Sequence, residues 1–138
     1  MEGTEVILLD THVLIWAMGS EPRLGRKARA LIENFWQAGN VAVSAISFWE
    51  AGLLHERRRI TLPVTPLAWR AEILAAGVIE HSLDGAVALR SIDLSGLPDD
   101  PADRFIAATA LVHGAALMTA DERILDWQHP LKRYDARK

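Results

Sequence analysis

Short apolar runs alternate with longer amphipathic segments along the whole chain. Four runs are rich in aliphatic residues and too short for helices, which is typical of strands in a buried parallel sheet; they are 6–9, 41–43, 78–81 and 115–118. Helical spacing of apolar residues predicts helices at 13–18, 23–37, 45–58, 66–76, 83–92, 101–113 and 122–125, and a last edge strand at 132–134. This alternation predicts an α/β fold, a single domain over 1–138 with a central, mostly parallel sheet flanked by helices on both faces.

The helix predicted at 101–113 carries an acidic residue on its apolar face. Asp100 and Pro101 are typical of a helix start, because Asp is a good N-cap and Pro is accepted at the first helical position. Asp103 then lies three and four residues before Ile106 and Ala107, on the side that packs inward. Since an unpaired carboxylate is costly on a packed face, Asp103 is predicted to have a cationic partner.

Three more acidic residues occupy unusual positions. Glu50 falls on the face of helix 45–58 that Ile46 and Leu53 predict to be apolar, where it either pairs with an arginine or shares a cation. Asp10 and Asp121 each follow a predicted buried strand, at the sheet edge where α/β proteins bind ligands. Each of these two could instead simply cap the helix that follows it.

If the four acids converge, electrostatic repulsion requires a cation among them. Two like charges ~4 Å apart cost about 4 kcal/mol at an effective dielectric of ~20. The sequence has no cysteine and no histidines at a recurring ligand spacing, so the oxygen donors favour Mg²⁺ or Mn²⁺. Such ions activate water for attack at phosphorus, which predicts metal-dependent phosphodiester hydrolysis.

Composition indicates the cellular compartment and the kinds of partner, but not the reaction. The absence of cysteine fits a reducing cytoplasm, and no apolar run approaches the ~20 residues that span a bilayer, so no membrane association is expected. The net charge of -3 argues against nucleic-acid binding through overall charge, although a local basic patch stays possible. The cluster at 57–59 is either a solvated helix end or a phosphate contact.

Taken together, the acidic motifs resemble those of PIN-domain ribonucleases of the VapC toxin type. The motifs that carry the resemblance are Leu8-Leu9-Asp10-Thr11-His12, the segment 44–54 around Glu50, Asp100-Pro101-Ala102-Asp103-Arg104 and Thr119-Ala120-Asp121. The resemblance implies an Mg²⁺- or Mn²⁺-dependent endoribonuclease that cuts RNA, is silenced by a cognate antitoxin and forms a homodimer.

The resemblance also implies roles for individual residues. Asp10 and Asp103 would be direct metal ligands, whereas Glu50 and Asp121 would hold the metal, a second metal or a metal-bound water. Thr11 and Thr119 match small hydroxyl positions beside the site, and Asp100 is a cap that would touch a metal-bound water. Arg104 would orient a neighbouring acid or meet phosphate, or form a plain surface ion pair.

Other interpretations stay open at this point. Haloacid dehalogenase-like phosphotransferases need a second Asp where this chain has His12, and response-regulator receivers need an acceptor Asp where it has His81, so both fit poorly. A catalytically silent PIN-fold module that binds RNA or protein is the main alternative. Trp16 and Trp49 could stack an RNA base or pack in the core, and His12 could approach the substrate. The helices near Trp36 and Trp69 are candidate dimer surfaces.

Overall fold

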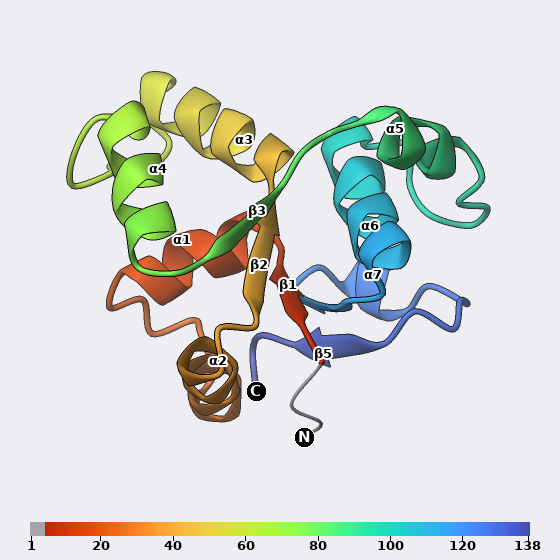
Figure 1. Ribbon diagram of the computed structural model, residues 1–138, viewed down its shortest axis with the longest axis horizontal. Helices are drawn as coiled ribbons and strands as arrows, with labels where there is room; N and C mark the ends of the chain where they lie inside the picture. The colour runs from red at the N-terminus through yellow and green to blue at the C-terminus, as the bar shows by residue number, and fades with distance from the viewer. Residues whose placement is uncertain (1–4) are drawn as a thin grey trace.

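The computed structural model describes residues 5–138 and contains one parallel sheet between two layers of helices (Figure 1). Within these residues five strands pair in the order β3-β2-β1-β4-β5, and every pair is parallel. The strands are β1 (Ile7–Leu9), β2 (Val41–Ser44), β3 (Ile79–His81), β4 (Ala116–Thr119) and β5 (Arg133–Asp135). The predicted α/β fold is therefore confirmed, with a sheet that is wholly rather than mostly parallel.

Helices cover both faces of this sheet. They are α1 (Thr11–Met18), α2 (Arg26–Gln37), α3 (Ala45–Glu56), α4 (Pro66–Ala75), α5 (Gly85–Ile92), α6 (Pro101–His113) and α7 (Glu122–Leu125). In Figure 1, α1, α2 and α4 lie on one side of the sheet, and α5, α6 and α7 lie on the other. None of the helices within residues 5–138 has the length and apolar character needed to cross a membrane.

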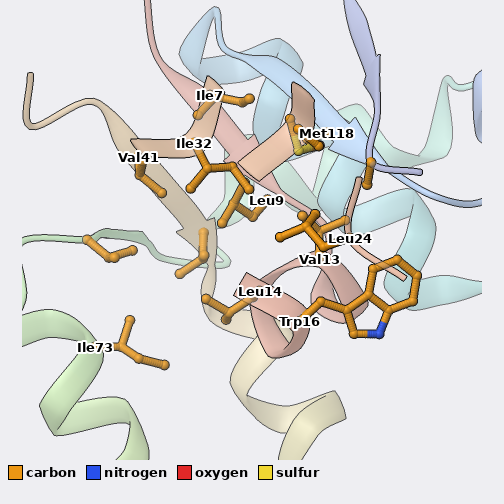
Figure 2. Packing of buried hydrophobic residues seen from close by; sticks show 14 of the residues in the cluster. Ile7, Leu9, Val13, Leu14, Trp16, Leu24, Ile32, Val41, Ile73 and Met118 are labelled. Carbon is orange, nitrogen blue, oxygen red and sulfur yellow. The ribbon is translucent and has the colours of Figure 1, made fainter. Parts of the chain in front are cut away.

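The central strand β1 explains why the sheet is buried on both faces. Ile7 and Leu9 pack with α1, α2 and α4 in one hydrophobic cluster, part of which Figure 2 shows. Leu8 points the other way and packs with Leu117 and with α5, α6 and α7 in a second cluster. A continuous apolar run is what a strand with two covered faces requires.

Three helix starts differ from the predicted ones by two or three residues, among them α5, predicted from residue 83, which begins at Gly85 after its cap Asp84. The helix predicted from residue 23 begins at Arg26, because Gly25 has extended backbone angles (φ -66°, ψ 159°). The helix predicted from residue 13 begins at Thr11, because the side chain of Asp10 caps it. The C-terminus of α6 was predicted correctly: Gly114 ends it with φ 64°, a left-handed conformation that favours glycine.

The predicted inner face of α3 was partly wrong, since Ile46 packs against the second cluster but Trp49 does not pack inward. Its buried residues are Ser47 and Ala51, and the side chain of Trp49 is 58% exposed. The helix contacts α1, α4 and α6, so small side chains at the contact allow close approach. Glu50, next to Ala51 and three residues after Ser47, still lies toward this packed side and is partly buried.

The two tryptophans near the candidate dimer surfaces pack within the chain itself. Trp69 is only 4% exposed and belongs to the core. Trp36 packs against the same core, and its indole nitrogen donates a hydrogen bond to the carbonyl of Ala76 at 2.9 Å. The helices that carry these rings, α2 and α4, stay a prediction for the dimer surface.

Candidate active site

The parallel register brings the carboxyl ends of β1 and β4 together. Leu9 pairs with Met118, so Asp10 and Thr119 lie side by side just beyond this pair. A cavity of about 360 Å³ opens at this edge. The residues that line it are Asp10, His12, Trp16, Glu50, Asp100, Asp103, Ala120, Asp121 and Arg123. All four acids singled out in the sequence therefore lie in one cavity, which we call the acid pocket.

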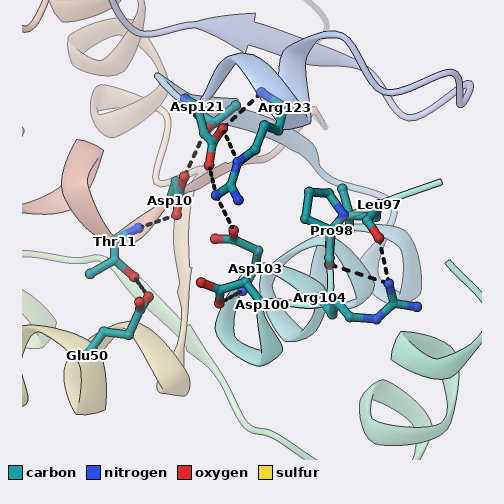
Figure 3. Close-up of polar contacts among 11 residues, drawn as sticks. Asp10, Thr11, Glu50, Leu97, Pro98, Asp100, Asp103, Arg104, Asp121 and Arg123 are labelled. Atoms are coloured by element: carbon teal, nitrogen blue, oxygen red, sulfur yellow. Dashed lines mark hydrogen bonds and ion pairs between the residues drawn. The ribbon is translucent and has the colours of Figure 1, made fainter. Parts of the chain in front are cut away.

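Asp10 is held by two hydrogen bonds, and no Lys or Arg of residues 5–138 forms an ion pair with it. One carboxylate oxygen accepts from the backbone N–H of Thr11 at 2.8 Å, and the other accepts from Oγ1 of Thr119 at 2.6 Å (Figure 3). Burial raises the pKa of Asp10, and the two hydrogen bonds oppose that rise. Asp10 thus caps α1 and also faces the acid pocket, so the two interpretations of this residue do not compete.

Glu50 reaches the same hydroxyl-lined region from α3. Its Oε1 lies 2.5 Å from Oγ1 of Thr11, which also lies 3.0 Å from Oγ of Ser47. Burial, followed by the negative charges of Asp10 and Asp100, raises the pKa of Glu50, although the hydrogen bond from Thr11 opposes this. No Lys or Arg among residues 5–138 forms an ion pair with Glu50, so the structural arginine considered for it is not found there.

Asp121 and Asp103 face an arginine that sequence reasoning missed. Nη2 of Arg123 lies 2.8 Å from Oδ2 of Asp121 and 3.4 Å from Oδ2 of Asp103 (Figure 3). Asp121 also caps α7 by accepting from the backbone N–H of Arg123 at 2.9 Å. The spacing Asp-x-Arg at a helix start is the sequence signal that could have found this pair.

Arg123 affects the pKa values of Asp121 and Asp103 to different extents. It lowers the pKa of Asp121, which it contacts most closely. Burial and the surrounding carboxylates raise the pKa of Asp103 to about 7, and its side chain is only 13% exposed. The predicted cationic partner of Asp103 therefore exists, but it leaves most of the negative charge in the pocket uncompensated.

The oxygen donors in the acid pocket are of the chemical type that binds hard divalent cations. Five carboxylates line it, and Arg123 is the only Lys or Arg among its lining residues. Carboxylate oxygens are the ligands that Mg²⁺ and Mn²⁺ prefer. As the side chains lie, no three His, Asp or Glu groups of residues 5–138 converge on one ion position. A bound cation would therefore require these carboxylates to adjust.

The accessory residues divide into two groups. Thr11 and Thr119 hydrogen-bond the acids, and Asp100 lines the pocket while capping α6 through the backbone N–H of Asp103 at 3.2 Å. Arg104 does not reach the pocket; Figure 3 shows it directed toward Leu97 and Pro98. It donates to four backbone carbonyls, those of Ser91, Ile92, Leu97 and Pro98, and lies 3.9 Å from Asp99. Arg104 thus holds the loop before α6 and does not orient an acid of the pocket.

Sequence and structure comparisons give consistent matches. Residues 7–128 match the sequence model of the PIN domain. The chain is 40% identical over 125 residues to Ribonuclease VapC22 of Mycobacterium tuberculosis (strain ATCC 25618 / H37Rv), covering 90% of this chain and 93% of that protein. VapBC2 from Rickettsia felis, bound to a promoter DNA fragment, matches with a TM-score of 0.68 and 16% identity, covering 94% of this chain and 98% of that chain. DNA-bound VapBC from Salmonella typhimurium matches with a TM-score of 0.67 and 19% identity, covering 96% and 98%.

Proposed function

Because this chain belongs to the PIN-domain family, we propose that it is a metal-dependent endoribonuclease and the toxin of a toxin–antitoxin pair. The observation that carries the proposal is the acid pocket, in which Asp10, Glu50, Asp103 and Asp121 from four different parts of the chain line one cavity. The 40% identity to a ribonuclease over 90% of the chain supports the same activity.

Within this proposal, the acids of the pocket divide the work. Asp10 and Asp103 would be direct ligands of Mg²⁺ or Mn²⁺, and Glu50 and Asp121 would hold the ion or water beside it. Such a cation, when bound, supplies activation of water and charge neutralisation at the phosphate. The raised pKa of Glu50 suits it to accept the proton of the attacking water while the water oxygen bonds to phosphorus and one P–O ester bond breaks, and the leaving ribose oxygen keeps the electron pair and takes a proton from solvent. The hydroxyl of Thr11 orients Glu50 for this role.

The partners follow from the relatives. The matched solved structures include VapBC complexes and a toxin–antitoxin complex from Klebsiella pneumoniae, so we propose a cognate antitoxin as the protein partner. We also propose that the protein acts in the cytoplasm, where RNA is available, and that it forms a homodimer as its family resemblance implies.

The test is cleavage of an RNA pool with Mn²⁺ or Mg²⁺, compared with the same reaction in chelator. Asp10→Asn and Asp103→Asn should each lower cleavage by at least about a hundredfold, because each removes a charged ligand from the pocket. Asp99→Asn is the matched control, since Asp99 is fully exposed beside the pocket but does not line it. Circular dichroism would check that the variants are folded.

Two outcomes would contradict the proposal. Cleavage that persists in chelator, or that survives both substitutions, would exclude the metal mechanism. A folded wild-type protein that binds RNA or antitoxin but cleaves no RNA in the pool would favour the alternative, a catalytically silent binding module.

A further inference from the structure

A second and larger cavity adjoins the acid pocket. It has a volume of about 820 Å³ and lies between α1 and the segment that follows α3. His12 and Trp16 line both cavities, so the two share a wall. Arg23 and Arg59 lie in the second cavity, which we call the arginine groove.

The unpaired charge in the arginine groove is positive. Its one acidic lining residue, Glu21, is neutralised by Arg23, whose Nε and Nη2 donate to the two carboxylate oxygens at 2.8 and 3.2 Å. Arg59, in contrast, forms no ion pair or side-chain hydrogen bond with any residue in the range 5–138. A free guanidinium thus lies next to a pocket whose charge is negative.

The backbone at the end of α3 sets the position of Arg59. The N–H of Arg59 bonds to the carbonyl of Leu54 at 2.8 Å, and that of Arg58 bonds to the carbonyl of His55 at 3.1 Å. This pair of hydrogen bonds forms a Schellman motif, in which the residue with left-handed backbone angles is usually glycine. Here it is Arg58 (φ 60°), the only non-glycine residue with positive φ among those described. The turn directs Arg59 into the arginine groove, while Arg58 lines neither cavity.

We propose that the arginine groove binds single-stranded RNA next to the cleaved bond, with Arg59 contacting a phosphate of the flanking strand. The proposal rests on the proposed function, because the groove would hold the flanking strand only when another phosphate of the same RNA lies at the acids. Guanidinium groups are well suited to phosphate, and grooves with free positive charge follow the backbone of single strands.

Two other features favour phosphate recognition in this groove. The ring of Trp16 is only 8% exposed and Arg23 covers it, with the guanidinium carbon 5.1 Å from the ring centre, so a base cannot stack there. The cavity on the other side of Glu50, beside Trp49, is smaller at about 260 Å³, and its wall contains Glu50 and Asp100 together with one arginine, Arg57. On that path phosphates would pass two carboxylates of the acid pocket for one arginine, whereas the one carboxylate in the arginine groove is already paired with Arg23.

The test compares Arg59→Gln with Arg58→Gln. Both remove one exposed arginine at the end of α3, but only Arg59 lines the groove. With a labelled single-stranded RNA of mixed sequence, about 12 nucleotides long, Arg59→Gln should raise KM about three- to tenfold at unchanged kcat. The salt dependence of binding, measured by fluorescence anisotropy, should fall by about 0.7 in slope, the value for one lost phosphate contact. Arg58→Gln should change KM less than about twofold.

The outcomes separate this inference from the proposed function. If the wild type cleaves RNA and the two variants have equal KM values, the groove assignment is overturned while the nuclease stands. If Arg59→Gln weakens antitoxin binding but not RNA binding, the groove is a protein surface. If the wild type neither binds nor cleaves RNA, both proposals fail.

Discussion

The same local motif occurs at the ends of two neighbouring strands, in two different settings. In Asp121-Glu122-Arg123 and in Asp135-Ala136-Arg137, the backbone N–H of the arginine donates to the carboxylate two residues earlier at 2.9 Å. In both, Nη2 of the arginine lies 2.8 Å from the second oxygen of that carboxylate. The arginine lowers the pKa of the aspartate in each case.

The surroundings of the two motifs differ in charge. Asp121 lines the acid pocket of about 360 Å³ together with four other carboxylates. Asp135 lines a cavity of similar size, about 380 Å³, in which it is the only acid among Lys27, Arg133 and Lys138. Short-range sequence therefore determines the ion pair, whereas the topology that surrounds it determines whether a further cation is attracted. We accordingly expect a catalytic role only for the Asp121 motif.

The largest expected difference between the motifs is in RNA cleavage. Asp121→Asn should lower kcat about 10- to 100-fold, since it removes a carboxylate that supports the metal and its water. Asp135→Asn removes an equivalent ion pair and should leave cleavage within about twofold. Steady-state rates of both variants, with melting temperatures to check folding, make the comparison. Equal losses would mean that Asp121 acts only through the fold.

The same contrast explains how much of the fold and site the sequence could predict. The strands and the convergence of Asp10 with Asp121 were predictable, because buried runs form parallel strands whose carboxyl ends share an edge. The inner face of α3 was not, because its contact uses Ser47 and Ala51, which no hydrophobic pattern identifies.

The arginines show the limit most clearly. Arg104 was close to the acids in sequence, yet its guanidinium binds backbone carbonyls of the preceding loop. Arg123 lies in the predicted helix 122–125, but its place beside Asp103 depends on the packing of α6 next to the end of β4. Which charge meets which acid is set by tertiary structure, and a single sequence does not contain that information directly.

A smaller effect is expected on the free energy of unfolding at pH 8. Removing a carboxylate should raise it at Asp103, beside the Asp121 motif, and lower it at Asp135. Asp103 has a pKa of about 7 in the folded protein, against ~3.9 in the unfolded chain. The folded state therefore holds the proton more tightly, and stability in chelator should fall as pH rises from about 4 to about 7. Asp103→Asn should reduce this fall, to which the raised pKa values of Asp10 and Glu50 also contribute, and stabilise the protein at pH 8 by about 1–2 kcal/mol, a value reduced for solvent screening.

Urea unfolding of the wild type and Asp103→Asn across this pH range measures the effect. Asp135→Asn is the contrasting variant, because Arg137 lowers the pKa of Asp135. The wild-type contribution of Asp135 is present at neutral pH and is lost as pH falls through its lowered pKa, so Asp135→Asn should destabilise the protein at pH 8. A lower stability of Asp103→Asn at pH 8 would mean that Asp103 is a structural ion-pair partner of Arg123.

The smallest expected difference is in Mn²⁺ affinity, which should depend on Arg123 but not on Arg137. A divalent cation that uses Asp121 must compete with Arg123 for its oxygens, because Arg123 already occupies both. Arg123→Gln should therefore tighten Mn²⁺ binding about three- to tenfold, measured by isothermal titration calorimetry, and lower the melting temperature in chelator. Arg137→Gln, which breaks the equivalent ion pair outside the acid pocket, should leave Mn²⁺ affinity unchanged. Weaker Mn²⁺ binding by Arg123→Gln would show instead that Arg123 positions Asp121 for the metal. The two motifs would then differ in the role of their arginine as well as in their surroundings.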